Sequence, residues 1–446
     1  MKSEDLRIFA SVKPFEYSAD RGASETIGWR KEHMSWKKTC YVGDWSFVPQ
    51  VRFTGPDVTR LFADLSTNSF ATFADGAAKH CIQCDERGKV VAEGVLLRYS
   101  EDDFEYESGT PMWACYHAVK GGYDVDFEFR FTHKLQISGP TALALCEELA
   151  GESLTDIKFM HFKNLDVGGM SVLFLRQGMA GEPGFELHGP IEQRAALYAR
   201  ILEVGAKHGV VELGRRGFMI NHLEACFPTG GTHFFNAVHD ERHSDYRDWV
   251  DAHIPEEWDG LPQAGALRYS RSSAIRGSFI ATDITEYYRS PYEMGWGRQV
   301  KFDHDFIGRE ALEKESSAPA RRVVTLEFNS EDVVEIYASM FNTDAEPFAY
   351  LEIPHQPYAN NWVDQVQKDG QSVGHATFPG YSYYFRRVLA LSFIDVEFAE
   401  PGTEVEILWG EPGERQRLIR ATVHPAPYKA DKRRDALVGT AAPVTV

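Results

Sequence analysis

Long apolar runs and positive charge are both scarce in this sequence. No run approaches the roughly 18 apolar residues of a membrane span, and residues 1–7 have neither the basic start nor the apolar stretch of a signal peptide. We therefore expect a cytoplasmic protein without a membrane partner. Lys and Arg number 47 against 66 Asp and Glu, so the formal net charge is −19. This excess of acid repels phosphate backbones, which argues against a nucleic-acid partner.

Cysteine and complete ligand motifs are scarce as well. Six cysteines in 446 residues are too few for a dense disulfide framework, so we expect reduced, mostly buried thiols. Cys81 and Cys84 have the spacing of a redox pair or half a zinc site, but nothing nearby completes it, which favours two packed thiols. His239 and His243 do not form the H-E-x-x-H pattern, which favours a solvated loop, and the glycines of residues 178–184 lack the dinucleotide-binding spacing. The sequence therefore predicts no metal site and no Rossmann or phosphate-binding loop.

The patterns that are present indicate an α+β protein. A chain of 446 residues with 43% hydrophobic side chains is long enough for two or three domains. A strand, a Gly-Pro pair and a helical pattern follow one another three times, at Gly55, Gly139 and Gly189, with proline suited to the first helical position. These units predict helices packed on antiparallel sheets. Beyond Ala320, short alternating segments between Gly and Pro turns predict a small β-barrel or sandwich.

Two groups of polar residues are candidates for a functional site. Glu186 begins an apolar strand, where its carboxylate can accept paired hydrogen bonds from an amino-pyrimidine edge such as a pterin; an ordinary edge-strand Glu fits as well. Residues 214–225 place His222, which can act as an acid or base near neutral pH, at helical spacing after Arg215 and Arg216, which can bind an anion. Structural ion pairs for the arginines and a packed role for the histidine stay open.

Nearly the whole chain resembles the folate-binding family of the glycine cleavage T-protein (aminomethyltransferase). Within it, the closest resemblance is to tetrahydrofolate-dependent aromatic O-demethylases that act on vanillate and syringate in lignin catabolism. The most specific match is VKFDHDFIGREAL at residues 300–312, preceded by PYEMG at 291–295. Further matching stretches are residues 44–46, 121–125, 175–186, 380–382, 401–405, 409–411 and 425–428.

This resemblance implies a fold and a set of site residues. The fold is α+β, a three-lobed, clover-like arrangement in which two interleaved α+β lobes and a C-terminal β-barrel surround a central channel. We therefore expect a folate-binding-type catalytic region over residues 1–320 and the barrel over residues 321–446. By position, Glu186 resembles the family's pterin-holding carboxylate, while Asn221 and Glu224 fall on a motif that lines the same cavity.

At seven positions the sequence departs from the demethylases, and we expect these positions to lie in a rebuilt site. Two departures remove groups that the vanillate and syringate enzymes use, namely a tyrosine that protonates the departing phenolate and an arginine that holds the substrate carboxylate. The replacements are Phe218 for the tyrosine, Gly109 for the arginine, Phe47 for a histidine, Phe227 for a tryptophan, Asp44 for a glutamine, His222 for a threonine and Arg276 for a glycine.

The rebuilt site leads to a first hypothesis, a carbon–carbon lyase that needs no cofactor. A phenylcoumaran-type (β-5) lignin dimer is bulky and neutral, and the enzyme would remove its hydroxymethyl group as formaldehyde. In this hypothesis His222 or Asp44 is the base, and Arg215, Arg276 or both stabilise the phenolate. The substrate-binding residues would be Phe47, Gly109, Phe218, Asn221 and Phe227.

A second hypothesis is a tetrahydrofolate-dependent O-demethylase, a methyltransferase that acts on a methoxylated arene. Here His222 replaces the tyrosine as proton donor, and Glu186 and Glu224 hold the folate. Both enzymatic hypotheses have a small aromatic substrate. A catalytically inactive protein with the folate-binding fold is a third, and the oligomeric state stays open.

Overall fold

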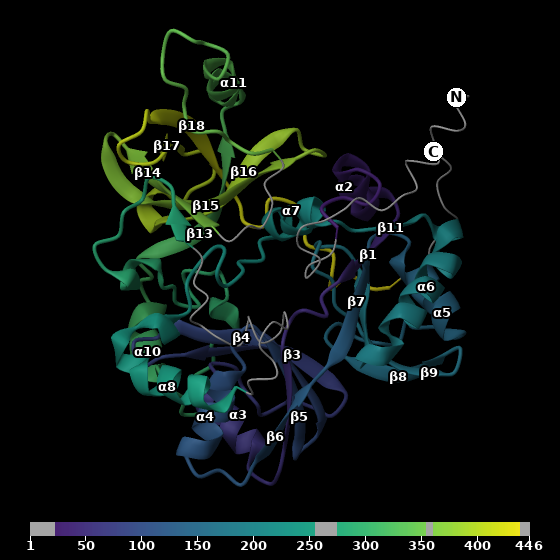
Figure 1. Cartoon of the computed structure of the whole chain (residues 1–446). Helices are drawn as coiled ribbons and strands as arrows, with labels where there is room; N and C mark the ends of the chain where they lie inside the picture. Colours follow the sequence, from purple (N-terminus) through teal and green to yellow (C-terminus); the bar gives the residue numbers. More distant parts are fainter. Residues whose placement is uncertain (1–22, 255–273, 354–359, 438–446) are drawn as a thin grey trace, which may run out of the picture.

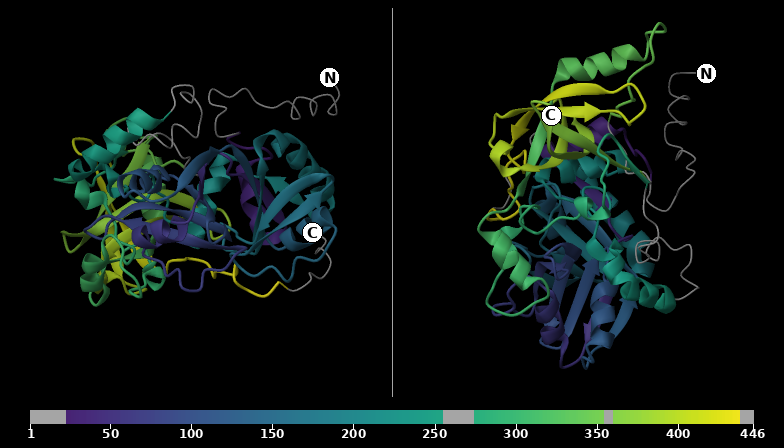
Figure 2. Two further views of the ribbon diagram at one scale, coloured as in Figure 1. Left: turned by 90° about the horizontal axis from the view of Figure 1, so that it is seen from below. Right: turned by 90° about the vertical axis from the view of Figure 1, so that its left-hand side faces the viewer.

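Three β-sheets with their covering helices form three lobes (Figure 1). The computed structural model describes residues 23–254, 274–353 and 360–437. Figure 2 shows the same arrangement from two other sides, and in its right-hand view the barrel lies at one end and the five-stranded sheet at the other. The α+β class with a C-terminal β-barrel that the sequence predicted is confirmed by these three sheets.

The first lobe contains a five-stranded antiparallel sheet in the order β3-β4-β5-β2-β6. Helix α3 (Val58–Leu65) packs on it through Val58, Leu61, Phe62 and Leu65, whose spacing of three and four residues gives the helix one apolar face. Helices α4 (Met112–Lys120) and α8 (Ser244–His253) extend the same core. The strands are β2 (Gln50–Thr54), β3 (Ala77–Cys84), β4 (Val90–Ser100), β5 (Asp103–Ser108) and β6 (Asp126–Arg130).

The second lobe contains a six-stranded sheet in the order β11-β1-β7-β10-β9-β8. Helices α5 (Ala142–Ala150) and α6 (Arg194–Gly205) contribute to its core. The chain forms β1 here, leaves to build the whole first sheet, and returns at β7, so the two lobes are interleaved. The strands are β1 (Cys40–Asp44), β7 (Thr132–Ser138), β8 (Phe162–Val167), β9 (Met170–Leu175), β10 (Gly184–Pro190) and β11 (Val210–Glu212).

The third lobe is a barrel that closes through the pairing of β14 with β17. Helix α11 (Ser330–Ser339) projects beyond it, at the top of Figure 1. Strand β12 (Ala274–Arg276) also pairs with β14, so the barrel sheet takes residues from both sides of position 320. The other strands are β13 (Arg321–Phe328), β14 (Asn360–Lys368), β15 (Gln371–Ser382), β16 (Arg387–Asp395), β17 (Glu404–Trp409) and β18 (Arg417–His424).

Two helices connect the second lobe to the barrel. Helix α2 (Trp29–Lys38) lies beside α7 (Arg215–Ala225) in the upper middle of Figure 1. Helix α2 contacts β1 and β11 of the second sheet, whereas α7 contacts β15 and β16 of the barrel. Residues on α7 therefore face both lobes.

The repeated Gly-Pro pairs form turns, but the prolines do not begin the helices. At Gly55 and Gly139, φ is +136° and +135°, and a Cβ would collide with a neighbouring carbonyl oxygen, so both turns require glycine. Helices α3 and α5 begin two residues after their prolines. At the third Gly-Pro pair, strand β10 continues through Gly189 and ends at Pro190. A 3₁₀ turn over Ile191–Gln193 then separates this proline from the start of α6.

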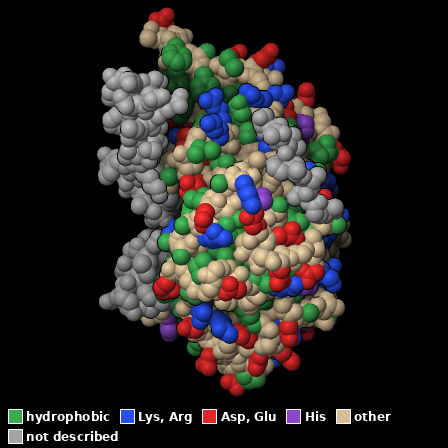
Figure 3. Space-filling model, turned by 90° about the vertical axis from the view of Figure 1, so that its right-hand side faces the viewer, with side chains coloured by type: hydrophobic (Ala, Val, Ile, Leu, Met, Phe, Trp, Pro, Cys, Tyr) green, Lys and Arg blue, Asp and Glu red, His purple; other side chains and the backbone are tan. Residues whose placement is uncertain are grey.

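Several smaller expectations can be checked against the described residues. All six cysteines are free thiols, and five of them are buried. His239 and His243 were predicted to lie in a solvated loop, which is wrong for His243, since it is buried against Trp113. Among the described residues, no helix has both the length and the apolar character to cross a membrane. On the face shown in Figure 3, acidic and basic side chains are interspersed.

Candidate functional site

An aromatic cluster surrounds His222 on one side of α7. Phe218 and His222 are four residues apart, on one face of the helix, with ring centroids 4.8 Å apart. Phe227 approaches the imidazole from beyond the end of α7 at 5.5 Å. Trp45 and Phe47, which follow β1, lie 5.2 and 6.0 Å from Phe218. The structure thus brings together four residues that the sequence predicted for the site, namely Phe47, Phe218, His222 and Phe227, and adds Trp45.

The imidazole of His222 is buried without a hydrogen-bond partner. Its exposure is 2%, and neither ring nitrogen has a partner among the described residues. Burial lowers the pKa of His222 to about 3, and the nearby His233 acts in the same direction. The ring is therefore neutral near pH 7 and holds one N–H donor and one free lone pair. A buried polar group without a partner is costly, so such groups are concentrated at functional sites.

Glu224 lies two residues further along α7 in a very different environment. Its Oε1 accepts hydrogen bonds from His33 Nε2 at 2.8 Å and Ser382 Oγ at 2.6 Å. Its Oε2 accepts from Lys37 Nζ at 2.6 Å and Trp36 Nε1 at 3.4 Å. Burial alone would raise the pKa of Glu224, but the hydrogen bonds and charges of His33 and Lys37 lower it to about 2.

These four donors correct the prediction that Glu224 holds a cofactor. A carboxylate has about four acceptor positions, and all of them are used within the protein. The donors come from α2 and from Ser382 at the end of β15, so Glu224 connects α2, α7 and the barrel. Its role is to join the lobes.

A chain of buried hydrogen bonds runs from α7 to Glu186 on β10. Asn221 Nδ2 donates to Tyr41 Oη at 3.4 Å, and Tyr41 Oη donates to Gln136 Oε1. Gln136 Nε2 and Gln177 Nε2 donate to Glu186 Oε1 at 2.8 and 2.9 Å. Asn221 Oδ1 has no partner among the described residues. The chain connects two predicted site residues, Asn221 and Glu186, through two that the sequence did not single out, Tyr41 and Gln136.

Glu186 belongs to a buried group of charged side chains. Burial raises the pKa of Glu186 to about 7. Its Oε2 lies 3.3 Å from His188 Nε2, which in turn is 4.0 Å from Glu107 Oε2. Burial also raises the pKa of Glu107 to about 7, although Lys134 and His188 oppose the shift. The Nζ of Lys134 donates to Val48 O at 2.8 Å. Burial therefore makes the Glu186 carboxyl easier to protonate than an exposed glutamate.

Two predicted catalytic residues form ion pairs that the sequence did not predict. Asp44 Oδ2 accepts from Arg194 Nε at 2.6 Å, and its Oδ1 accepts from the Ser46 backbone N–H at 2.9 Å, which does not suit a free base. Arg276 is exposed on β12 and pairs with Glu411 of the barrel, so it does not fill the space beside the aromatic cluster.

The two remaining predicted residues are also outside the aromatic cluster. Arg215, at the first turn of α7, donates from Nη2 to Ser24 Oγ at 3.0 Å. Gly109 is exposed and follows β5, and a Cβ at this position would meet no atom within 4 Å. The position that aligns with the arginine of the demethylases is therefore surrounded by open space in this protein.

Known proteins resemble this chain over most of its length. The model of the GCVT N-terminal domain matches residues 9–239, and that of the glycine cleavage T-protein C-terminal barrel domain matches residues 349–428. Syringate O-demethylase of Sphingobium sp. (strain NBRC 103272 / SYK-6) is 32% identical over 92% of this chain and 90% of its own length. Sesamin methylene transferase of Sinomonas sp. (strain No.22) is 32% identical over 91% and 89%.

A solved structure gives the same fold. The crystal structure of glycine cleavage system aminomethyltransferase T from Bartonella henselae superposes with a TM-score of 0.66 at 18% identity, covering 96% of this chain and 97% of that one. At this identity the likeness concerns the arrangement of the three lobes. The chemistry depends on the residues described above.

Proposed function

The chain belongs to the glycine cleavage T-protein family, and from this premise we propose that it removes a methyl group from a methoxylated aromatic compound and passes it to tetrahydrofolate. Two relatives at 32% identity are named for O-demethylation and for methylene transfer, which are both one-carbon reactions. The observation that carries the proposal is His222, a neutral, buried imidazole with no partner among the described residues, enclosed by aromatic rings.

The residues on the β10 side suit the amino-pyrimidine edge of a folate. Glu186 uses three of its roughly four acceptor positions on Gln136, Gln177 and His188, which leaves one. Asn221 Oδ1 is a second acceptor without a partner among the described residues. An N–H edge that met both acceptors would remove the cost of leaving them unpaired. Tetrahydrofolate, when bound, supplies the amine nitrogen that accepts the methyl group.

His222 has the two atoms that proton transfer in this reaction needs. The departing phenolate oxygen needs a proton, and bound tetrahydrofolate would provide one from the amine that takes the methyl group. The N–H of His222 donates to the phenolate oxygen, and its other nitrogen takes up the proton from that amine, so the imidazole is neutral before and after. The growing phenolate charge raises the pKa of His222 during the step. Phe218 and Phe227 exclude water and hold the imidazole in place.

The test is incubation with a panel of methoxylated phenols and benzoates, with and without tetrahydrofolate. We expect one equivalent of 5-methyltetrahydrofolate per phenol released and no release when folate is omitted. Free formaldehyde as the product, in amounts independent of folate, would refute the proposal.

One observation favours a second candidate, the folate-independent formaldehyde lyase. Phe218, which is 4.8 Å from His222, has no hydroxyl to donate to a phenolate, whereas the free lone pair of His222 suits a base. In this reaction the ether C–O bond of the phenylcoumaran ring opens first, which gives a phenolate and a quinone methide. The base then removes the proton of the hydroxymethyl group, the carbon–carbon bond breaks to release formaldehyde, and its electron pair converts the quinone methide into a stilbene phenolate. A phenylcoumaran dimer added to the same panel, with formaldehyde measured in parallel, separates the two candidates.

A further inference from the structure

A buried group of one histidine and two glutamates lies where the first two sheets meet. Glu107 ends β5 of the first sheet, and Glu186 and His188 point from the same face of β10 in the second, since they are two residues apart. One ligand atom from each of the three side chains lies within 4.8 Å of the others. The three residues are 7%, 4% and 4% exposed. We call them the Glu107–Glu186–His188 triad. The sequence predicted no metal site, because sheet pairing brings these residues together from separate segments.

The triad has unused ligand capacity. Glu107 Oε2, which lies 4.0 Å from His188 Nε2, has no hydrogen-bond partner among the described residues, although the side chain is more than nine-tenths buried. Glu186 Oε1 accepts from Gln136 and Gln177, which fixes the carboxylate and turns Oε2 toward His188. A carboxylate oriented by other side chains in this way is typical of metal ligands.

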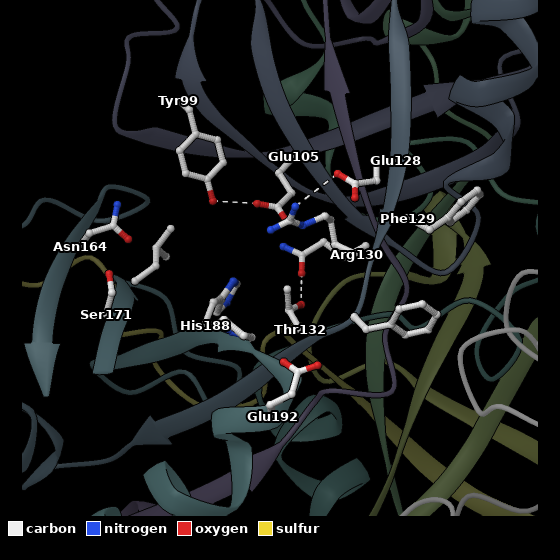
Figure 4. Close-up of a pocket in the computed structure, with 15 residues that line it drawn as sticks. Tyr99, Glu105, Glu128, Phe129, Arg130, Thr132, Asn164, Ser171, His188 and Glu192 are labelled. Atoms are coloured by element: carbon white, nitrogen blue, oxygen red, sulfur yellow. Dashed lines mark hydrogen bonds and ion pairs between the residues drawn. The ribbon is translucent and has the colours of Figure 1, made fainter. Parts of the chain in front are cut away.

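An acidic pocket borders the triad at His188. It has a volume of about 400 Å³, and His188 forms part of its lining (Figure 4). Glu105, Glu128 and Glu192 also line the pocket, whereas Arg130 is its one lysine or arginine and already pairs with Glu128 at 3.3 Å. Carboxylates around an opening raise the local concentration of cations.

We propose that the Glu107–Glu186–His188 triad binds one divalent transition-metal ion that enters through this pocket. Ligand atoms about 2.1 Å from an ion are about 3 Å apart when adjacent and about 4 Å apart when opposite. The separations of His188 Nε2 from the two carboxylates, 3.3 and 4.0 Å, lie within that range. One imidazole with two carboxylates suits Mn²⁺ or Zn²⁺, whereas Ca²⁺ and Mg²⁺ prefer oxygen ligands alone.

The experiment measures Mn²⁺ binding to the folate-free full chain by electron paramagnetic resonance, which detects the free ion. We expect one saturable site per chain. Glu107→Gln and His188→Gln should each weaken binding on the order of 10- to 100-fold. Glu128→Gln removes a carboxylate from the same pocket but outside the triad, and its affinity should stay within about threefold of the parent protein, because it is not a ligand.

A second measurement shows that the variants are folded. Mn²⁺ should raise the melting temperature of the parent protein and of Glu128→Gln, but not that of Glu107→Gln, since only an ion bound to the native state stabilises it. Absence of a saturable site in the parent protein would overturn the proposal. Equal losses of Mn²⁺ affinity in Glu107→Gln and Glu128→Gln would overturn it as well, because the ion would then be attracted by the overall negative charge of the pocket and not bound by the triad. Glu186 is shared with the proposed folate site, so Mn²⁺ binding is measured without folate. Glu107 lies outside that site, so loss of Mn²⁺ binding in Glu107→Gln tests the metal proposal and leaves the folate proposal standing.

Discussion

His222 and Glu224 lie two residues apart on α7, and both are almost fully buried, yet their environments are opposite. Glu224 accepts four hydrogen bonds and pairs with Lys37, whereas His222 has no hydrogen-bond partner among the described residues and contacts aromatic rings. The four bonds of Glu224 hold α2, α7 and the barrel together. The free imidazole contributes little to that assembly and has both nitrogens available for chemistry. We therefore assign Glu224 to stability and His222 to catalysis, and four variants or conditions can separate these roles.

The largest effect is expected for His222→Phe. Loss of a group that donates and accepts the transferred proton should lower kcat on the order of 10²- to 10⁴-fold. The free energy of unfolding should stay the same or rise by about 1 kcal/mol, because a buried polar group without a partner becomes an apolar one. Product formation and urea unfolding measure the two quantities. A variant that keeps a third or more of the parent kcat would show that His222 is not the proton-transfer group.

The next largest effect is expected for Glu224→Gln, on stability. Removing the charge leaves the buried ammonium of Lys37 uncompensated, which should cost about 3 to 5 kcal/mol. Ser382→Ala is the matched control, since it removes one hydrogen bond to the same carboxylate and should cost about 1 kcal/mol. Urea unfolding measures both. If both variants lost the same small amount of unfolding free energy, the role of Glu224 in joining the lobes would be contradicted.

The dependence of stability on pH should differ between the two residues. The pKa of His222 is lowered in the folded state to about 3, so between about pH 6.5 and 3 the unfolded state binds the proton more readily, and the folded protein loses stability as the pH falls through this range. The pKa of Glu224 is lowered to about 2, so its contribution is complete above about pH 4.5 and is lost between pH 4.5 and 2. Relative to His222→Phe, the parent protein should lose up to about 1.4 kcal/mol per pH unit below pH 6. Parallel profiles between pH 7 and 5 would contradict this.

The smallest effect is expected for Arg276→Gln. Its ion pair with Glu411 is exposed, and such pairs contribute about 0 to 1 kcal/mol. Both the free energy of unfolding and the turnover should therefore stay close to those of the parent protein, turnover within about twofold. A tenfold loss of turnover would return Arg276 to the site, as the sequence predicted.

The fold was predictable because its signals are local or are carried by long matching motifs. Alternating strands and the stretch at residues 300–312 indicated the lobes, and Phe47, Phe218, His222 and Phe227 were predicted for one site and lie in one cluster. The helix starts were misplaced by two residues or more, since proline also suits the turn that precedes a helix.

The partners of each polar residue were not predictable, because they come from distant segments. Glu224 is bonded by His33 and Ser382, which are 191 and 158 positions away. Gln136 reaches Glu186 because strand register places the two residues opposite each other on β7 and β10. The sequence predicted Glu224 for cofactor binding and His222 for catalysis, and the packing of α2 and the barrel against α7 shows which of the two has its polar atoms occupied.

The assignment of His222 to catalysis and Glu224 to stability is tested most directly by kcat per folded molecule. The two variants His222→Phe and Glu224→Gln are compared, with the folded fraction of each determined by circular dichroism in the same samples. The account predicts a loss on the order of 100-fold or more for His222→Phe and a loss of less than about tenfold for Glu224→Gln, whose damage is to stability. Equal losses per folded molecule, or a larger loss for Glu224→Gln, would contradict it.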